Sequence, residues 1–94
     1  MDIRKVSLSK KAEKDLRKLP QHIILKLAAW IEDVGERGLA EVRKIAGYHD
    51  EALKGKRRHQ RSIRLSKHYR AIYEVADNKK IVFVNVLEVN KHEY

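Results

Sequence analysis

The chain has 94 residues, of which 43% are hydrophobic and 37% are charged, and it contains no cysteine. This length suits one domain, residues 1–94, because a single core usually takes roughly 100–150 residues and nothing is left for a second. The apolar fraction excludes a disordered chain, and the lack of cysteine excludes disulfide scaffolds, thiolate metal sites and cysteine nucleophiles.

The sequence carries no signal for a membrane. No apolar run approaches the roughly 18–20 residues of a membrane span. The chain starts with Met1-Asp2-Ile3-Arg4 and enters patterned sequence directly, without the apolar stretch of a signal peptide. We therefore expect a cytoplasmic protein that does not contact a membrane.

The positive charge is concentrated in one stretch. Lys and Arg number 22 against 13 Asp and Glu, a formal net charge of +9. Residues 54–70 hold 8 of the basic residues and no acidic one, so that 14 basic residues face 13 acidic ones in the rest of the chain. Such a block repels itself unless a polyanion neutralises it, which predicts a site for nucleic-acid phosphates. The alternative is a solvated basic face that serves solubility.

The first half of the chain is expected to be a strand followed by helices. Residues 3–8 alternate in a way compatible with a short strand, and Ser9 can cap a helix over residues 10–19. A broad apolar stripe at helical spacing over residues 23–34 predicts a second helix, stopped by the glycines at its end. One further short helical turn is expected over residues 39–45.

The second half changes to the alternation typical of strands. Three such runs cover residues 61–65, 69–75 and 81–89, and the short polar segments between them indicate hairpin turns. The predicted element order is β-α-α-β-β-β. We expect an α+β fold in which two N-terminal helices pack on one face of an antiparallel sheet and leave the other face free.

Two arginines are predicted to face each other across the first hairpin. If residues 66–68 form its loop, Arg64 lies opposite Arg70, and alternation turns both side chains away from the helices. Like charges across a ladder are destabilising, so an anion between them would reverse the sign of the interaction. Guanidinium groups bind phosphate through two hydrogen bonds and can stabilise a pentacoordinate phosphorane. The alternative is an exposed pair neutralised by Glu74 or Glu88.

The last strand is expected to bring the C-terminus toward this pair. His92 is the only histidine on or just beyond that strand, and it titrates near neutral pH as a general acid or base does. Tyr94 offers a phenol and a ring that can stack on a base. The alternative is that both terminal residues lack a function. His49, with Asp50 and Glu51, lies in a loop that can rim the site.

No cofactor and no metal ion are expected. The histidines lack paired ligand spacing such as i, i+4, and no glycine-rich phosphate loop is present. Trp30 is predicted to lie in the core.

The whole pattern resembles the RelE/HigB-type toxins of bacterial type II toxin–antitoxin modules, within the RelE/ParE superfamily. The resemblance spans nearly the whole chain and rests on four segments: Leu53-Lys54-Gly55, Ser62-Ile63-Arg64-Leu65, Tyr69-Arg70-Ala71-Ile72-Tyr73 and Lys91-His92-Glu93-Tyr94. Toxins of this type enter the ribosomal A site and cut the mRNA there, and a cognate antitoxin blocks them. The resemblance implies a RelE-like microbial RNase fold, a metal-independent mRNA endoribonuclease that inhibits translation, and operator DNA bound only through the toxin–antitoxin complex.

The resemblance also implies roles for single residues. Arg64 and Arg70 correspond to the cationic pair that holds the scissile phosphate, His92 to the terminal acid–base residue, and Tyr94 to an orienting or stacking group. The residues expected to contact the backbone of ribosomal and messenger RNA are Lys54, Lys56, Arg57, Arg58, Arg61 and Lys91.

In the expected reaction a base takes the proton of the ribose 2′-hydroxyl, and the oxygen attacks the adjacent phosphorus. An acid then protonates the leaving 5′-oxygen, and a 2′,3′-cyclic phosphate results. The candidate acid is His92, and the base is His59, Glu93 or a water molecule.

The chain departs from the family pattern at one position. Ser62 stands where some members carry a lysine, so one catalytic cation is either missing or replaced by Arg61 or Arg58. The related ParE branch shares the fold and poisons gyrase without cutting RNA. A gyrase-binding toxin and a non-catalytic nucleic-acid-binding module therefore remain as alternatives.

Overall fold

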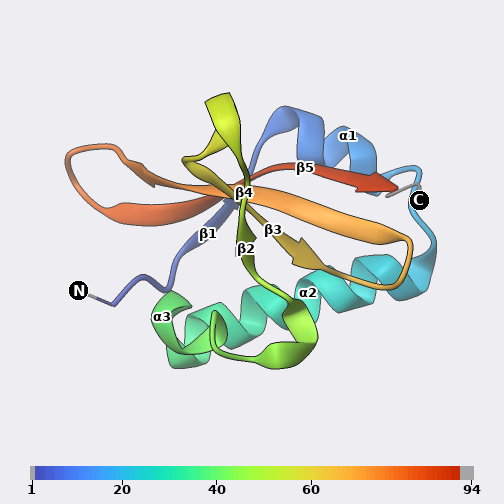
Figure 1. Cartoon of the computed structure of the whole chain (residues 1–94), viewed down its shortest axis with the longest axis horizontal. Coiled ribbons are helices and arrows are strands. Elements are labelled where there is room, and N and C mark those ends of the chain that lie inside the picture. Colours follow the sequence, from blue (N-terminus) through green and yellow to red (C-terminus); the bar gives the residue numbers. More distant parts are fainter. Residues whose placement is uncertain (1, 92–94) are drawn as a thin grey trace.

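The computed structural model describes residues 2–91, which form a five-stranded sheet with helices packed against it (Figure 1). The strands are β1 (Val6–Leu8), β2 (Glu51–Ala52), β3 (Gln60–Arg64), β4 (Tyr69–Asp77) and β5 (Val82–Lys91). The helices are α1 (Lys10–Leu16), α2 (Gln21–Arg37) and α3 (Leu39–Val42), followed by the 3₁₀ turns η1 (Ala46–Tyr48) and η2 (Gly55–Arg57). The predicted α+β class is confirmed.

The strand order in the sheet is β1-β5-β4-β3-β2. Strands β3, β4 and β5 form the predicted antiparallel meander, and the two-residue strand β2 extends it beside β3. The antiparallel prediction does not hold for β1, which runs parallel to β5 with Val6 beside Val84. A parallel neighbour needs a long crossover, and the chain from α1 to β4 provides it.

Local sequence explains where the first two helices begin and end. The Ser9 hydroxyl accepts a hydrogen bond of 3.0 Å from the N–H of Ala12, as a helix cap does, and donates one of 2.6 Å to the Leu87 carbonyl on β5. Helix α2 continues through Gly35, one of the two expected stops, and ends before Gly38. Gly38 has a φ of 82°, a conformation that glycine adopts without steric cost.

The core lies between α2 and one face of the sheet, called here the helix-covered face. Trp30 is fully buried, as predicted, and its ring centroid is 5.3 Å from that of Tyr73 on β4. Helix α1 lies beside β5, where the Asp15 carboxylate accepts a hydrogen bond from the backbone N–H of Val89. The core residues that α2 and the helix-covered face of the sheet contribute are Ile23, Leu27, Trp30, Val34, Ile63, Leu65, Ala71, Tyr73, Val84, Val86 and Val89. Within residues 2–91 no helix is long and apolar enough to cross a bilayer.

The opposite face, called here the open face, is only partly free. Arg57 in η2 donates to Gln60 on β3 over 2.7 Å and to Glu88 on β5 over 3.4 Å, so its guanidinium lies above β4 between them. Ile72, in the middle of this face, is 0% exposed. The free part of the open face therefore lies toward the hairpin that joins β3 to β4.

Candidate active site

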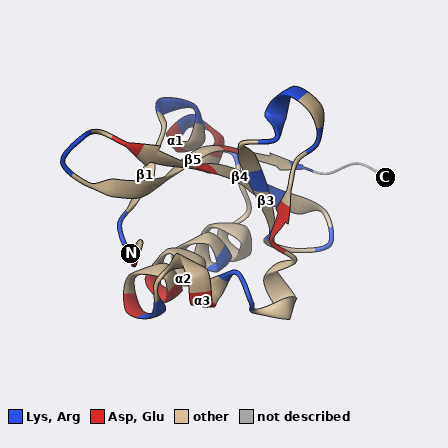
Figure 2. Cartoon of the chain, turned by 60° about the vertical axis from the view of Figure 1, so that its left-hand side comes forward, with Lys and Arg blue, Asp and Glu red and all other residues tan. Residues whose placement is uncertain are grey.

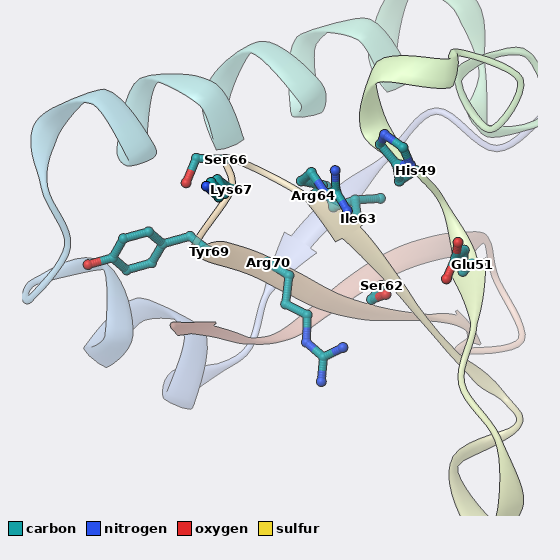
Figure 3. Close-up of a pocket in the computed structure, with 9 residues that line it drawn as sticks. All are labelled: His49, Glu51, Ser62, Ile63, Arg64, Ser66, Lys67, Tyr69 and Arg70. Carbon is teal, nitrogen blue, oxygen red and sulfur yellow. The ribbon is translucent and has the colours of Figure 1, made fainter. Parts of the chain in front are cut away.

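Arg64 and Arg70 lie side by side at the free end of the open face. The predicted pairing is confirmed, because Arg64 on β3 is the register partner of Arg70 on β4. The backbone N–H of Leu65 donates to the Tyr69 carbonyl over 2.9 Å, so the Leu65 and Tyr69 pair is hydrogen-bonded. The adjacent arginine pair is then a non-hydrogen-bonded one, whose Cα atoms lie closer together than those of a bonded pair. From these neighbouring positions the Arg70 side chain extends away from Arg64 in Figure 3.

No carboxylate neutralises this pair within residues 2–91. The alternative partner Glu88 is an ion-pair partner of Arg57 at 3.4 Å and accepts a hydrogen bond of 2.6 Å from the Asn90 amide. Arg64 is exposed, whereas Arg70 is half-buried and its Nε is inaccessible and without a hydrogen-bond partner in the described chain. Arg70 Nε is thus a buried donor that no group of the described chain satisfies, as is Trp30 Nε1 in the core.

The arginine pair belongs to a cavity of about 190 Å³ (Figure 3). Its lining includes three basic residues, Arg64, Lys67 and Arg70, and one acidic residue, Glu51. The phenol of Tyr69 points away from the arginines in Figure 3, so it does not reach the space between them. The residues that line the cavity are His49, Glu51, Ser62, Ile63, Arg64, Ser66, Lys67, Tyr69 and Arg70.

Glu51 and His49 enter this cavity from the segment before β3. Glu51 is exposed and pairs with Ser62 across β2 and β3, which places it one strand away from the arginine-bearing hairpin. The sequence indicated only that this segment can rim the site. The structure brings a carboxylate and an imidazole to the same cavity as the two guanidinium groups, which is the set of groups that proton transfer beside a phosphate requires.

Asp50, between these two residues, anchors the segment from the other side. Its side chain is 1% exposed, and its two oxygens accept hydrogen bonds of 2.5 Å from Arg61 Nε and from the Tyr73 hydroxyl. Burial and the hydrogen bond to Asp50 raise the pKa of Tyr73 to about 12, so the phenol keeps its proton for this bond. Because Asp50 is fixed inward, its neighbours His49 and Glu51 are held at the cavity.

Removal of the Asp50 carboxylate is expected to destabilise the protein. In Asp50→Ala, Arg61 and the buried Tyr73 hydroxyl lose their acceptor, a loss of about 3 kcal/mol in the free energy of unfolding. For a domain of this size the melting temperature should fall by on the order of 15 °C. Urea and thermal denaturation measure both quantities. Glu32→Ala, which removes an exposed carboxylate of α2, is the matched control, and equal stability of the two variants would contradict this role of Asp50.

The other predicted cations do not all join the arginine pair. Arg61 alternates with Ser62 along β3, so its side chain lies on the helix-covered side with Asp50 and Tyr73. Together with Arg58 and His59 it lines a different cavity. None of these three residues lines the cavity that Arg64 and Arg70 line. Lys54 and Lys56 are exposed around η2.

The C-terminal strand passes beside the arginine pair, as predicted. Asn90 on β5 is the register partner of Arg70, and the exposed Lys91 is that of Tyr69. The candidate residues His92 and Tyr94, and the alternative base Glu93, lie outside the described residues. Within residues 2–91, no three His, Asp or Glu side chains are grouped as metal ligands.

Comparison with known proteins agrees with this architecture. The model of the family described as the ParE toxin of the type II toxin–antitoxin system, parDE, matches residues 6–91. No curated protein sequence matches the chain.

Several solved toxin structures share the fold. The YoeB/ParE toxin from Agrobacterium tumefaciens superimposes with a TM-score of 0.70 at 16% identity, over 95% of this chain and 99% of that one. The RelBE2 toxin–antitoxin complex from Mycobacterium tuberculosis matches with a TM-score of 0.68 at 21% identity, over 96% of this chain and 99% of that one. The E. coli DinJ-YafQ toxin–antitoxin complex matches with a TM-score of 0.72 at 17% identity, over 96% of this chain and 94% of that one. The sequence match over nearly the whole chain and the shared fold show that this chain belongs to the ParE toxin family of type II toxin–antitoxin systems, within the RelE/ParE superfamily.

Proposed function

We propose that this toxin is a ribosome-dependent endoribonuclease that cuts mRNA in the A site and thereby inhibits translation. The observation that carries the proposal is the pair Arg64 and Arg70, adjacent on one face, without a carboxylate partner in the described chain, and with Arg70 Nε unsatisfied. Two guanidinium groups in this position can hold a phosphodiester and stabilise the charge of a phosphorane.

Glu51 is our candidate for the general base. Of the residues described, it is the one carboxylate in the cavity that holds both arginines, and it makes no ion pair there. A carboxylate beside the arginine-bound phosphate can take the proton of the attacking 2′-hydroxyl. This assignment replaces His59, which lines the other cavity. His49, at the rim, is a second group that can exchange protons there.

His92 remains the proposed acid that protonates the leaving 5′-oxygen, and Tyr94 the proposed stacking group. The support for both is the course of β5, which runs past Arg70 at Asn90 immediately before these residues. Lys54, Lys56, Arg57, Arg58, Arg61 and Lys91 are the proposed contacts with the RNA backbone. Arg57 must exchange the Glu88 carboxylate for a phosphate to make such a contact.

A cognate antitoxin is the proposed protein partner. The RelBE2 and DinJ-YafQ structures are toxin–antitoxin complexes, and their toxins share this fold. We infer that the antitoxin of this chain blocks access to the arginine pair, and that the toxin contacts operator DNA only through the complex.

A gyrase-binding toxin is the second candidate, since the matching family model is that of the ParE toxin. Expression of the chain without an antitoxin, followed by mapping of transcript 5′ ends, distinguishes the two. The ribonuclease predicts growth arrest with new 5′ ends inside reading frames. A gyrase poison predicts the DNA-damage response with intact transcripts, and a non-catalytic binding module predicts harmless expression. Either of the last two results would refute the ribonuclease.

A further inference from the structure

A second cationic cavity lies on the side of the sheet opposite Arg64 and Arg70. Its volume is about 340 Å³, and its lining residues are Arg43, Arg58, His59, Arg61, Tyr73 and Val75. Arg61 and Tyr73 are register partners on the helix-covered face of β3 and β4. Because successive residues of a strand point to opposite faces, this cavity is separated from the first one by the thickness of the sheet.

The charges around this cavity do not balance. It contains the guanidinium groups of Arg43, Arg58 and Arg61, whereas the only carboxylate bonded to its lining residues in the described chain is that of Asp50. Both Asp50 oxygens are already used by Arg61 and Tyr73. Neither Arg43 nor Arg58 makes an ion pair within residues 2–91. Two positive charges are therefore left over at one concave surface.

The geometry holds two of these groups ready for a ligand. Arg43 donates through Nε to the Tyr73 hydroxyl over 3.3 Å, and Arg61 donates through Nε to Asp50. Arg43, which is exposed, makes this one hydrogen bond through Nε, and its terminal Nη groups have no hydrogen-bond partner in the described part of the chain. The free Nη groups of an arginine can donate two hydrogen bonds at once to phosphate oxygens. Arg58 is exposed at the mouth.

We propose that this cavity is a second phosphate-binding site, which takes a phosphodiester of an RNA backbone separate from the one at Arg64 and Arg70. Basic residues continue from one face to the other: Arg57 lies over the open face, and the next residue, Arg58, lines this cavity. Figure 2 shows Lys and Arg in the chain after α3, in the loop that contains η2 and along β3. A polyanion with regularly spaced phosphates fits such a continuous surface better than a single carboxylate does.

The test uses RNA binding, because the inference rests on the proposed RNA target but not on cleavage. Fluorescence anisotropy of a labelled single-stranded RNA is measured against salt concentration for a variant with Arg64→Gln and Arg70→Gln, which silences the first site. Adding Arg43→Gln and Arg58→Gln should weaken binding about three- to tenfold and reduce the slope of log K against log salt by about 1. The matched control adds Lys79→Gln and Lys80→Gln, an equal loss of charge at the exposed β4–β5 turn.

The source of the phosphate is identified by repeating the comparison with purified ribosomes in a sedimentation assay. A loss of binding in both assays indicates messenger RNA, and a loss with ribosomes alone indicates ribosomal RNA; both support the site. Binding equal to that of the control in both assays would overturn it.

Two further measurements keep the result interpretable. Arg58→Gln alone removes a side chain without a hydrogen bond in the described chain, so an unchanged melting temperature shows that weaker RNA binding is not unfolding. If the wild-type protein binds RNA and the cavity variant behaves as the control does, the second site is wrong and the ribonuclease proposal stands. If the wild-type protein binds neither RNA nor ribosomes, both are wrong.

Discussion

Replacement of Arg70 by alanine is expected to lower the rate of mRNA cleavage by about 10²–10³-fold and to abolish growth arrest, while the fold stays intact. Arg70 makes no ion pair in the described chain, and its Nε has no partner there, so the substitution removes no internal contact of the guanidinium. What it does remove is one of the two groups that stabilise charge on the phosphate. Cleavage of ribosome-bound mRNA, with thermal melting in parallel, measures both effects.

The control for this prediction is Arg17→Ala, which removes an exposed arginine at the end of α1. It should cleave at the wild-type rate. Because Arg70→Ala removes the repulsion between Arg64 and Arg70, we expect the variant to be slightly more stable than the wild type while it loses activity. Full cleavage by Arg70→Ala at wild-type stability would refute the assignment of the phosphate site.

Replacement of Glu51 by glutamine is expected to lower the cleavage rate by about 10²–10⁴-fold, because the amide cannot accept the proton of the 2′-hydroxyl. Single-turnover cleavage at saturating toxin concentration measures the rate of the chemical step and separates this effect from weaker binding.

Glu74→Gln is the matched control for Glu51→Gln. Glu74 lies on the same open face, beside Gln60, but does not line the cavity, so its neutralisation changes the charge of the face without removing the proposed base. Single-turnover cleavage by Glu51→Gln within about threefold of wild type would instead assign the base to another group.

The sheet meander and its paired arginines could be predicted because both depend on local patterns. Alternation over β3 and β4 and a short polar connection fix the register of a hairpin, and the register alone places Arg64 opposite Arg70. The ends of the strands differ from the expected ones by one to two residues, with β3 starting at Gln60 and β5 ending at Lys91. Such shifts do not alter which side chains share a face.

The short strand β2 and the role of Asp50 could not be predicted in this way. A two-residue strand has too few residues to show a period, and Asp50 lies next to Glu51 in a run that reads as a polar loop. What distinguishes the two carboxylates is burial: one is bonded to Arg61 and Tyr73, which are distant in sequence, and the other lines the cavity. Contacts between residues that are distant in sequence do not affect the spacing of apolar and polar residues along the chain, so this spacing cannot predict them.

The sequence by itself determined the α+β class, the concentration of positive charge before and within the β3–β4 hairpin, and the arginine pair, because each follows from the spacing of neighbouring residues. Only the tertiary structure decided how that charge is divided. The pleat sends Arg61 to one side of β3 and Arg64 to the other, and the partners of each come from distant segments. The basic residues of one stretch of sequence therefore line two separate cavities, because the two faces of the sheet exist only once the chain has folded.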